Sequence, residues 1–292
     1  MTVRPCWLGV CLVVLLAPSA LAGDEPAPAA RVETRVYKKT AQAELALAIH
    51  YPPGWTASDK RPMIVFFFGG GWTNGKITQF EPQASYLASR GLVAARADYR
   101  VKSRHEVTPE QCVEDAKSAM RWCRSHAREL GVDPDKLIAA GGSAGGHIAA
   151  CTSLAPGLDA KDDDLAISSR PNALVLFNPV LSFEGVPQLM ERIGGREELG
   201  KAISPTSHLS AESPPTILFY GGDDRLLAQG ESHQAKAKSL GARVELEVTP
   251  GQGHGYFNRS PHRERTLKQA DEFLKSLGYL DGPPTIVIPR EP

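Results

Sequence analysis

Short runs of mostly apolar residues recur along the chain and are separated by stretches with helical spacing. The runs cover residues 43–51, 63–68, 92–98, 137–140, 173–178, 216–220 and 244–248. Most of them show no regular alternation with polar residues, which is typical of strands buried on both faces of a parallel sheet. Residues 43–51 instead alternate with a period of two, as a strand with one buried face does.

The segments between these runs place apolar residues every three or four positions, as helices with one buried face do. Helices are predicted near residues 80–90, 231–240 and 267–277, and directly after residue 143. The best marked helix begins with Thr108 as N-cap, Pro109 in the first helical position and Gln111 three residues on. Its apolar pattern runs to Leu130, and Gly131 ends it. Strands that alternate with helices predict an α/β fold, a doubly wound and mostly parallel sheet with helices on both faces.

Composition and charge bound the class of protein. The 292 residues are 42% hydrophobic and 23% charged, with a formal net charge of zero, which fits a single globular domain, here residues 32–280. No basic run points to a nucleic-acid partner. Residues 179–215 are mostly polar and predict an insertion that overhangs a site at the strand ends, with one short helix near residues 197–203. Residues 281–292 predict a tail without packing signals beyond three apolar residues.

Residues 1–22 resemble a secretory signal peptide. A basic residue precedes an apolar run, and residues 20–22 form a small-x-small cleavage site. A membrane anchor is the alternative, but the run is shorter than the ~20 residues of a spanning helix. A lipoprotein signal at Cys11 lies too near the start of the chain. We therefore expect cleavage after residue 22, a flexible linker at residues 23–31, a secreted or periplasmic protein and no stable membrane insertion after cleavage.

Three cysteines remain after that cleavage, namely Cys112, Cys123 and Cys151. Cys112 and Cys123 lie eleven positions apart on one predicted helix, so about 16 Å separates them, too far for a disulfide. We expect free buried thiols. The cysteine spacing predicts no metal site, and no cofactor is implied.

Residues 141–145 read Gly-Gly-Ser-Ala-Gly, a Gly-x-Ser-x-Gly pattern between a predicted strand and a predicted helix. A serine at such a sharp turn takes a strained backbone conformation that lifts its hydroxyl clear of the sheet. The N-terminus of the helix behind it stabilises negative charge. Ser143 is therefore the candidate nucleophile.

A serine nucleophile needs a histidine base. In the chain order of serine, acid and histidine, the histidines after Ser143 are His233, His254 and His262. His233 and His262 are expected at solvated helix positions, whereas His254 lies in a glycine-rich loop directly after a strand. His254 is the candidate base.

The histidine in turn needs an acid that holds its tautomer. Asp223 and Asp224 both follow the strand at residues 216–220. The spacing of Gly221, Asp224 and Leu227 favours Asp224, and Asp223 stays the alternative.

An acyl-transfer site also needs donors for the oxyanion. The backbone N–H of Ala144 is one candidate, and the glycine run that contains Gly70 and Gly71 offers others, because glycine allows the backbone to approach a substrate closely. A phosphate-binding loop would need a different glycine spacing, or a lysine followed by serine or threonine. Trp72, directly after the glycines, is the candidate substrate-binding residue.

Taken together, these residues resemble the α/β-hydrolase superfamily, and within it the esterase and lipase group related to hormone-sensitive lipase and to small carbohydrate (acetylxylan) esterases. The likeness covers about residues 63–277. It is carried by Phe68-Gly69-Gly70-Gly71-Trp72, Asp98-Tyr99-Arg100, Gly141 to His147, Asn178-Pro179-Val180, Ser204-Pro205, His208-Leu209, Pro214-Pro215, Gly221 to Asp224 and Gly253-His254-Gly255.

The resemblance implies a catalytic triad of Ser143, Asp224 and His254, with the oxyanion hole at Gly70, Gly71 and Ala144. The family usually has histidine at the position of Phe68, where it supports the glycine loop. His147 and Asp98 are expected to be structural.

The resemblance implies a secreted serine carboxylic ester hydrolase that forms an acyl-enzyme. Its expected substrates are small-molecule or polysaccharide esters with small acyl groups, such as acetylated polysaccharide. The alternatives are a non-catalytic binding protein with the α/β-hydrolase fold and a peptidase or amidase of that fold. The sequence sets no oligomeric state.

Overall fold

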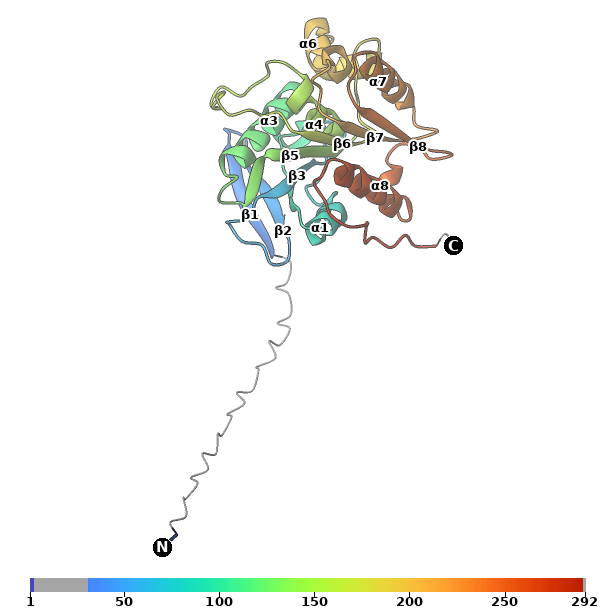
Figure 1. Ribbon diagram of the computed structural model, residues 1–292. Helices are drawn as coiled ribbons and strands as arrows, with labels where there is room; N and C mark the ends of the chain where they lie inside the picture. The colour runs from blue at the N-terminus through green and yellow to red at the C-terminus, as the bar shows by residue number, and fades with distance from the viewer. Residues whose placement is uncertain (3–30, 291–292) are drawn as a thin grey trace.

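The computed structural model describes residues 1–2 and 31–290, so nearly all of the predicted signal peptide and of the predicted linker lies outside the described residues. One eight-stranded sheet runs through the protein in the order β1-β2-β4-β3-β5-β6-β7-β8 (Figure 1). Its strands are β1 (Arg31–Lys39), β2 (Glu44–Tyr51), β3 (Arg61–Phe67), β4 (Val93–Ala97), β5 (Val132–Gly142), β6 (Ala173–Phe177), β7 (Thr216–Gly221) and β8 (Val244–Thr249). β2 pairs antiparallel with β1 and β4, and every other neighbouring pair is parallel. The predicted α/β fold with a mostly parallel sheet is confirmed.

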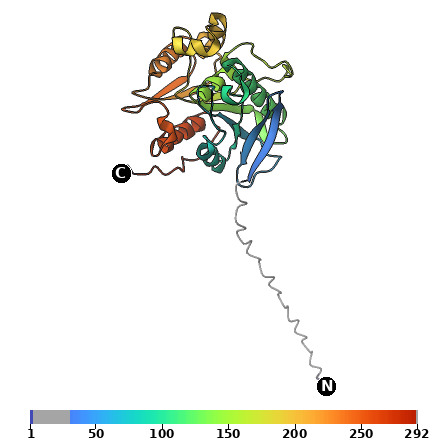
Figure 2. The same cartoon turned by 180° about the vertical axis from the view of Figure 1, so that it is seen from behind.

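Helices cover both faces of the sheet, as Figure 2 shows from behind. The helices and 3-10 turns are α1 (Glu81–Ser89), α2 (Lys102–His105), α3 (Pro109–Ser125), α4 (Ala144–Leu154), α5 (Pro187–Met190), η1 (Glu191–Ile193), α6 (Glu197–Ala202), η2 (Pro205–His208), α7 (Leu227–Ser239), η3 (Tyr256–Asn258) and α8 (His262–Ser276). One apolar cluster joins the sheet to α3, α4 and α7, and a second joins it to α1 and α8. The sheet is therefore packed between two layers of helices.

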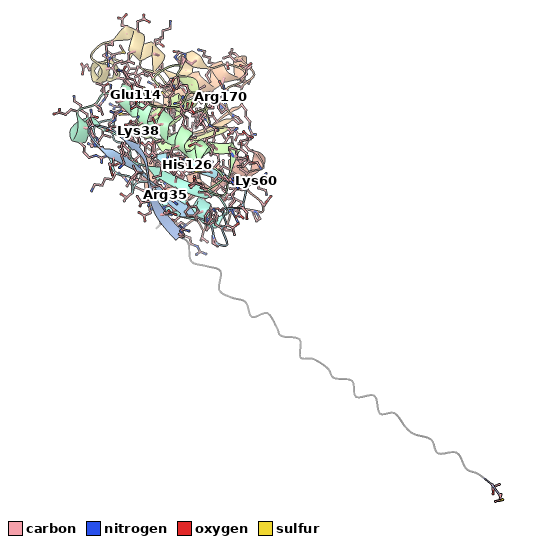
Figure 3. All side chains as sticks on the ribbon, turned by 90° about the vertical axis from the view of Figure 1, so that its left-hand side faces the viewer. Arg35, Lys38, Lys60, Glu114, His126 and Arg170 are labelled. Atoms are coloured by element: carbon pink, nitrogen blue, oxygen red, sulfur yellow. The ribbon has the colours of Figure 1, made fainter. Side chains whose placement is uncertain are left out.

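The first strand, β1, was not predicted. It lies at the edge of the sheet and pairs only with β2. Most of its side chains are exposed, including Val32 and Val36 at 53% and 42%, so it carries no apolar run. Viewed from this edge (Figure 3), charged side chains of β1 and α3 lie at the surface, among them Arg35, Lys38 and Glu114. Lys38 donates to the buried carboxylate of Asp115, which ties β1 to α3.

Helix α3 is shorter than its pattern predicts. The capping box of Thr108 and Gln111 starts it as expected, but it ends at Ser125 instead of Leu130. The residues up to Leu130 form turns, and Ala127 and Leu130 remain buried without being helical. An apolar spacing of three or four residues therefore persisted through a turn and gave no signal of where the helix stops.

The segment at residues 179–215 holds more regular structure than the one short helix predicted. The expected helix is α6, and α5, η1 and η2 flank it. Cys112, Cys123 and Cys151 are free and buried, as predicted, and burial raises the pKa of all three thiols. Within residues 1–2 and 31–290, no helix is both long and apolar enough to span a bilayer.

Candidate active site

Ser143 sits at a tight turn between β5 and α4. Its backbone has φ 53° and ψ −120°, a conformation that non-glycine residues rarely adopt and that costs about 1–3 kcal/mol. The flanking glycines make the turn sterically feasible, because a Cβ on Gly141 would lie 2.5 Å from the carbonyl of Gly145. A Cβ on Gly145 would lie 2.1 Å from the carbonyl oxygen of Phe67. The N–H of Ser143 donates to Phe177 O at 2.9 Å, which fixes the turn to β6.

His254 joins Ser143 to Asp224. Ser143 Oγ lies 2.9 Å from His254 Nε2, and His254 Nδ1 donates to Asp224 Oδ2 at 2.8 Å. The Asp224 side chain is fully buried, whereas 39% of the His254 side chain is exposed, so the imidazole faces the surface with the carboxylate behind it. Asp223, the alternative acid, is exposed, and its backbone N–H donates to Gln252 O at 2.9 Å, outside this group.

The loop that carries His254 is fixed by close backbone packing. A Cβ on Gly221 at the end of β7 would lie 2.0 Å from Gln252 O. Asn178, which follows β6, is fully buried and accepts the Gly255 N–H at 2.9 Å through its side-chain oxygen. Its amide nitrogen lies 3.4 Å from His254 Nε2. The Asn-Pro motif marked this position in the sequence but gave it no role.

The glycine loop after β3 packs against this turn. A Cβ on Gly69 would lie 3.4 Å from Ser143 Cβ. Gly70 and Gly71 have φ values of 133° and 62°, which favour glycine. Among the described residues, none accepts a hydrogen bond from the Gly70 or Gly71 N–H. The Ala144 N–H opens α4 and so has no partner within the helix.

The side chains of Gln79 and Tyr99 bind the backbone at the start of the glycine loop. Gln79 accepts the Gly69 N–H at 2.6 Å, and its own amide donates to Asn258 at 3.0 Å. Phe68 stacks on Tyr99 at 4.1 Å, and the Tyr99 hydroxyl donates to Phe68 O at 2.6 Å. Gln79 was not recognised from the sequence, because a polar residue ahead of a helix carries no motif.

Trp72 is turned away from Ser143. Its side chain is buried, its indole N–H donates to His147 Nδ1 at 3.2 Å, and the opposite nitrogen of His147 donates to Ile203 O at 2.7 Å. Burial lowers the pKa of His147 to about 4, so the ring is neutral and links the glycine loop to the insertion. Trp72 does not line the cavity at Ser143. His147 is thus structural, as expected.

A cavity of about 600 Å³ opens over Ser143 and His254. Its other lining residues are Gly69, Gly70, Gly71, Gly75, Lys76, Thr78, Gln79, Asn178, Arg192, Arg225, Gly255, Phe257 and Asn258. Phe257 is the single apolar side chain in this lining. Arg192 comes from η1, so the insertion does reach the site, where it donates to Gly71 O at 3.0 Å.

His233 is not solvated, contrary to expectation. It is 1% exposed, because α7 packs its ring against η2, where Nδ1 lies 2.8 Å from Thr206 Oγ1. Desolvation, aided by Lys236, lowers its pKa to about 4. His262 is half-buried. Neither ring lines the cavity at Ser143, and no group of residues that could hold a metal is found in the described part of the chain.

Residues 47–197, more than half of the chain, match the BD-FAE family model. The structure is similar to that of Thermogutta terrifontis esterase 2 phosphoramylated by tabun, with a TM-score of 0.82 and 46% identity over 90% of this chain and 100% of that chain. In Mycobacterium tuberculosis, the esterase LipQ is 28% identical over 79% of this chain and 59% of its own length. The carboxylesterase NlhH of that organism is 25% identical over 79% of this chain and 77% of its own. The chain belongs to the BD-FAE family and is a serine carboxylic ester hydrolase of the α/β-hydrolase fold.

Proposed function

We propose that the protein hydrolyses small acyl esters through Ser143, His254 and Asp224. The observation that carries this proposal is the unbroken hydrogen-bonded chain from the Ser143 hydroxyl through the imidazole to a buried carboxylate. That arrangement allows the imidazole to take the serine proton while the carboxylate stabilises the resulting cation.

The reaction has two halves. Ser143 Oγ attacks the ester carbonyl carbon as its proton moves to His254 Nε2, and the carbonyl oxygen becomes an oxyanion. The N–H groups of Gly70, Gly71 and Ala144 bind that oxyanion, each contributing about 3 kcal/mol of barrier lowering. His254 then gives its proton to the departing alkoxide, which leaves an acyl-enzyme on Ser143. A water molecule, activated by the same imidazole, releases the acid.

The lining of the cavity supports short acyl groups and a polar alcohol. Polar side chains and glycine backbone surround Ser143, and no long aliphatic side chain lines the cavity. An octanoyl chain would therefore gain little apolar burial there. The similar esterase 2 of Thermogutta terrifontis has been solved with propionate and with butyrate bound, which supports the same acyl size. Acetylated polysaccharide, with a polar sugar alcohol, fits this lining.

We further infer that the enzyme acts outside the cytoplasm, since the first 22 residues read as an export signal. The test is expression in a bacterial host followed by N-terminal sequencing of the protein from each cell fraction. Cleavage after residue 22 and recovery outside the cytoplasm are expected. Cytoplasmic protein that retains its first residues would contradict export.

Hydrolysis of p-nitrophenyl acetate, butyrate and octanoate, and of acetylated xylan, tests the catalytic proposal. The wild type should prefer acetate or butyrate over octanoate, and Ser143→Ala should lose at least about 10³-fold in kcat. Equal activity of wild type and variant would remove Ser143 from the mechanism. A folded wild type without activity on any ester would favour a binding protein.

Paraoxon gives an independent readout of the same serine. The similar esterase 2 has been solved phosphorylated by paraoxon. We expect one diethylphosphoryl group on the tryptic peptide that contains Ser143, and none in Ser143→Ala. Modification elsewhere, with activity retained, would contradict the assignment.

A further inference from the structure

The cavity at Ser143 is lined by cations without carboxylates. Lys76, Arg192 and Arg225 line it, and no aspartate or glutamate does. The four other cavities described all mix the two signs, for example Lys102 and Arg192 with Glu106 in the small neighbouring one. Since the whole chain has as many acidic as basic residues, this lining departs from the rest of the surface.

The three cations also differ from most arginines of the protein in having no acidic partner. Most buried or half-buried arginines elsewhere pair with carboxylates, as Arg100 does with Asp115 at 2.8 Å. Within the residues that the structure describes, Lys76, Arg192 and Arg225 form no ion pair. Like charges that share a cavity repel one another, and a bound anion relieves that repulsion.

These cations come from three separate segments and face the same cavity. Lys76 follows the glycine loop, Arg192 lies in η1 of the insertion, and Arg225 directly follows Asp224. Arg192 is held in place, since Nη1 donates to Gly71 O at 3.0 Å and Thr73 Oγ1 at 3.1 Å. Its guanidinium carbon lies 5.9 Å from the centre of the Trp72 ring. Lys76 and Arg225 are exposed, and their side chains make no hydrogen bond with any described residue, so both side chains are free to reach a substrate.

We propose that this cavity selects esters that carry a carboxylate in addition to the scissile ester group. The inference rests on the proposed function and names its substrate class. Lys76, Arg192 and Arg225 together supply the countercharge, and the field of the cations also steers such esters toward Ser143. Acyl esters of acidic sugars and half-esters of dicarboxylic acids belong to this class.

Two matched substrate pairs test the proposal and separate the two ends of the ester. On the acyl side, p-nitrophenyl hydrogen glutarate is compared with the neutral p-nitrophenyl pentanoate. On the alcohol side, 4-acetoxybenzoate is compared with the neutral 4-acetoxybenzamide. The quantity measured is the ratio of kcat/KM for the charged ester to that for its neutral partner. Intrinsic reactivity cancels when this ratio is compared between enzyme variants.

Lys76→Gln and Arg225→Gln should each lower that ratio by about three- to fivefold on at least one pair, and the double variant by about tenfold. The pair that responds identifies the end of the ester that carries the carboxylate. Raising the ionic strength should lower the wild-type ratio as well, because the screening length falls from about 30 Å at 0.01 M to about 8 Å at 0.15 M.

Lys161→Gln is the matched control, since it removes an exposed cation that does not line the cavity. It should leave both ratios unchanged. If the ratios are equal in the wild type and in the double variant on both pairs, the inference is overturned. Hydrolysis of the neutral esters would in that case still support the proposed function. Loss of hydrolysis of every ester in the wild type removes both.

Discussion

The buried His233 makes the protein sensitive to acid in a way that a single substitution can isolate. Burial lowers its pKa from 6.5 to about 4. The folded protein therefore keeps the ring neutral at a pH where the unfolded chain protonates it. Its contribution to stability is fully present above the unfolded pKa of about 6.5 and is lost as the pH falls through the folded value. The difference of 2.5 pKa units corresponds to about 3 kcal/mol.

Urea unfolding of the wild type and of His233→Gln, followed at several values between about pH 7 and pH 4, measures this contribution. The glutamine cannot titrate, so the free energy of unfolding of the wild type relative to the variant should fall by about 3 kcal/mol over that range. Gln234→Ala is the control on the same helix, because it removes a half-buried side chain that bonds to Val244 O and does not titrate. Its difference from the wild type should stay constant. A constant difference for His233→Gln as well would show that the ring is not held neutral, and the reasoning from burial would fail.

Three further predictions test the site. Asp224→Asn should lower kcat by about 10⁴-fold, because the imidazole loses its orienting carboxylate. Asp223 is exposed and unconnected to His254, so Asp223→Asn should keep wild-type kcat in the same assay. The reverse outcome would reassign the acid. Gly145→Ala should lower the free energy of unfolding by about 3 kcal/mol, since its Cβ would lie 2.1 Å from a backbone oxygen, and wild-type stability in urea would contradict the packing of the turn. Gln79→Leu should lower kcat by about tenfold, because the glycine loop is displaced. Gln79→Glu should retain most of the wild-type kcat. Equal kcat in both variants and the wild type would show that Gln79 does not position the loop.

The sequence predicted the central strands well because burial on both faces leaves an unmistakable apolar run. It also selected Ser143, Asp224 and His254, and in the structure His254 lies within hydrogen-bond distance of both other residues. Chain order and the position of each residue at a strand end were sufficient, since parallel strands bring their carboxyl ends to one edge of the sheet.

The rest depended on contacts that leave no local pattern. The edge strand β1 pairs only with β2, and most of its side chains are exposed, so its sequence is polar. The helical position of His233 gave no sign that η2, about 25 residues earlier, would cover it. Trp72 looked like a cavity residue from its place after the glycines, but His147 takes up its indole N–H.

The position of the insertion follows from two such contacts and bears on its role. Arg192 holds Gly71 O on one side of Trp72, and Ile203 O holds His147, the partner of the Trp72 indole, on the other. Swinging residues 179–215 away as a lid would break both hydrogen bonds, at about 1 kcal/mol for the exposed one and more for the buried one. These two contacts tie the insertion to the glycine loop, and they oppose its opening. In the proposed mechanism, substitution of Arg192 should change kcat together with KM, because this residue lines the cavity and also holds the glycine loop.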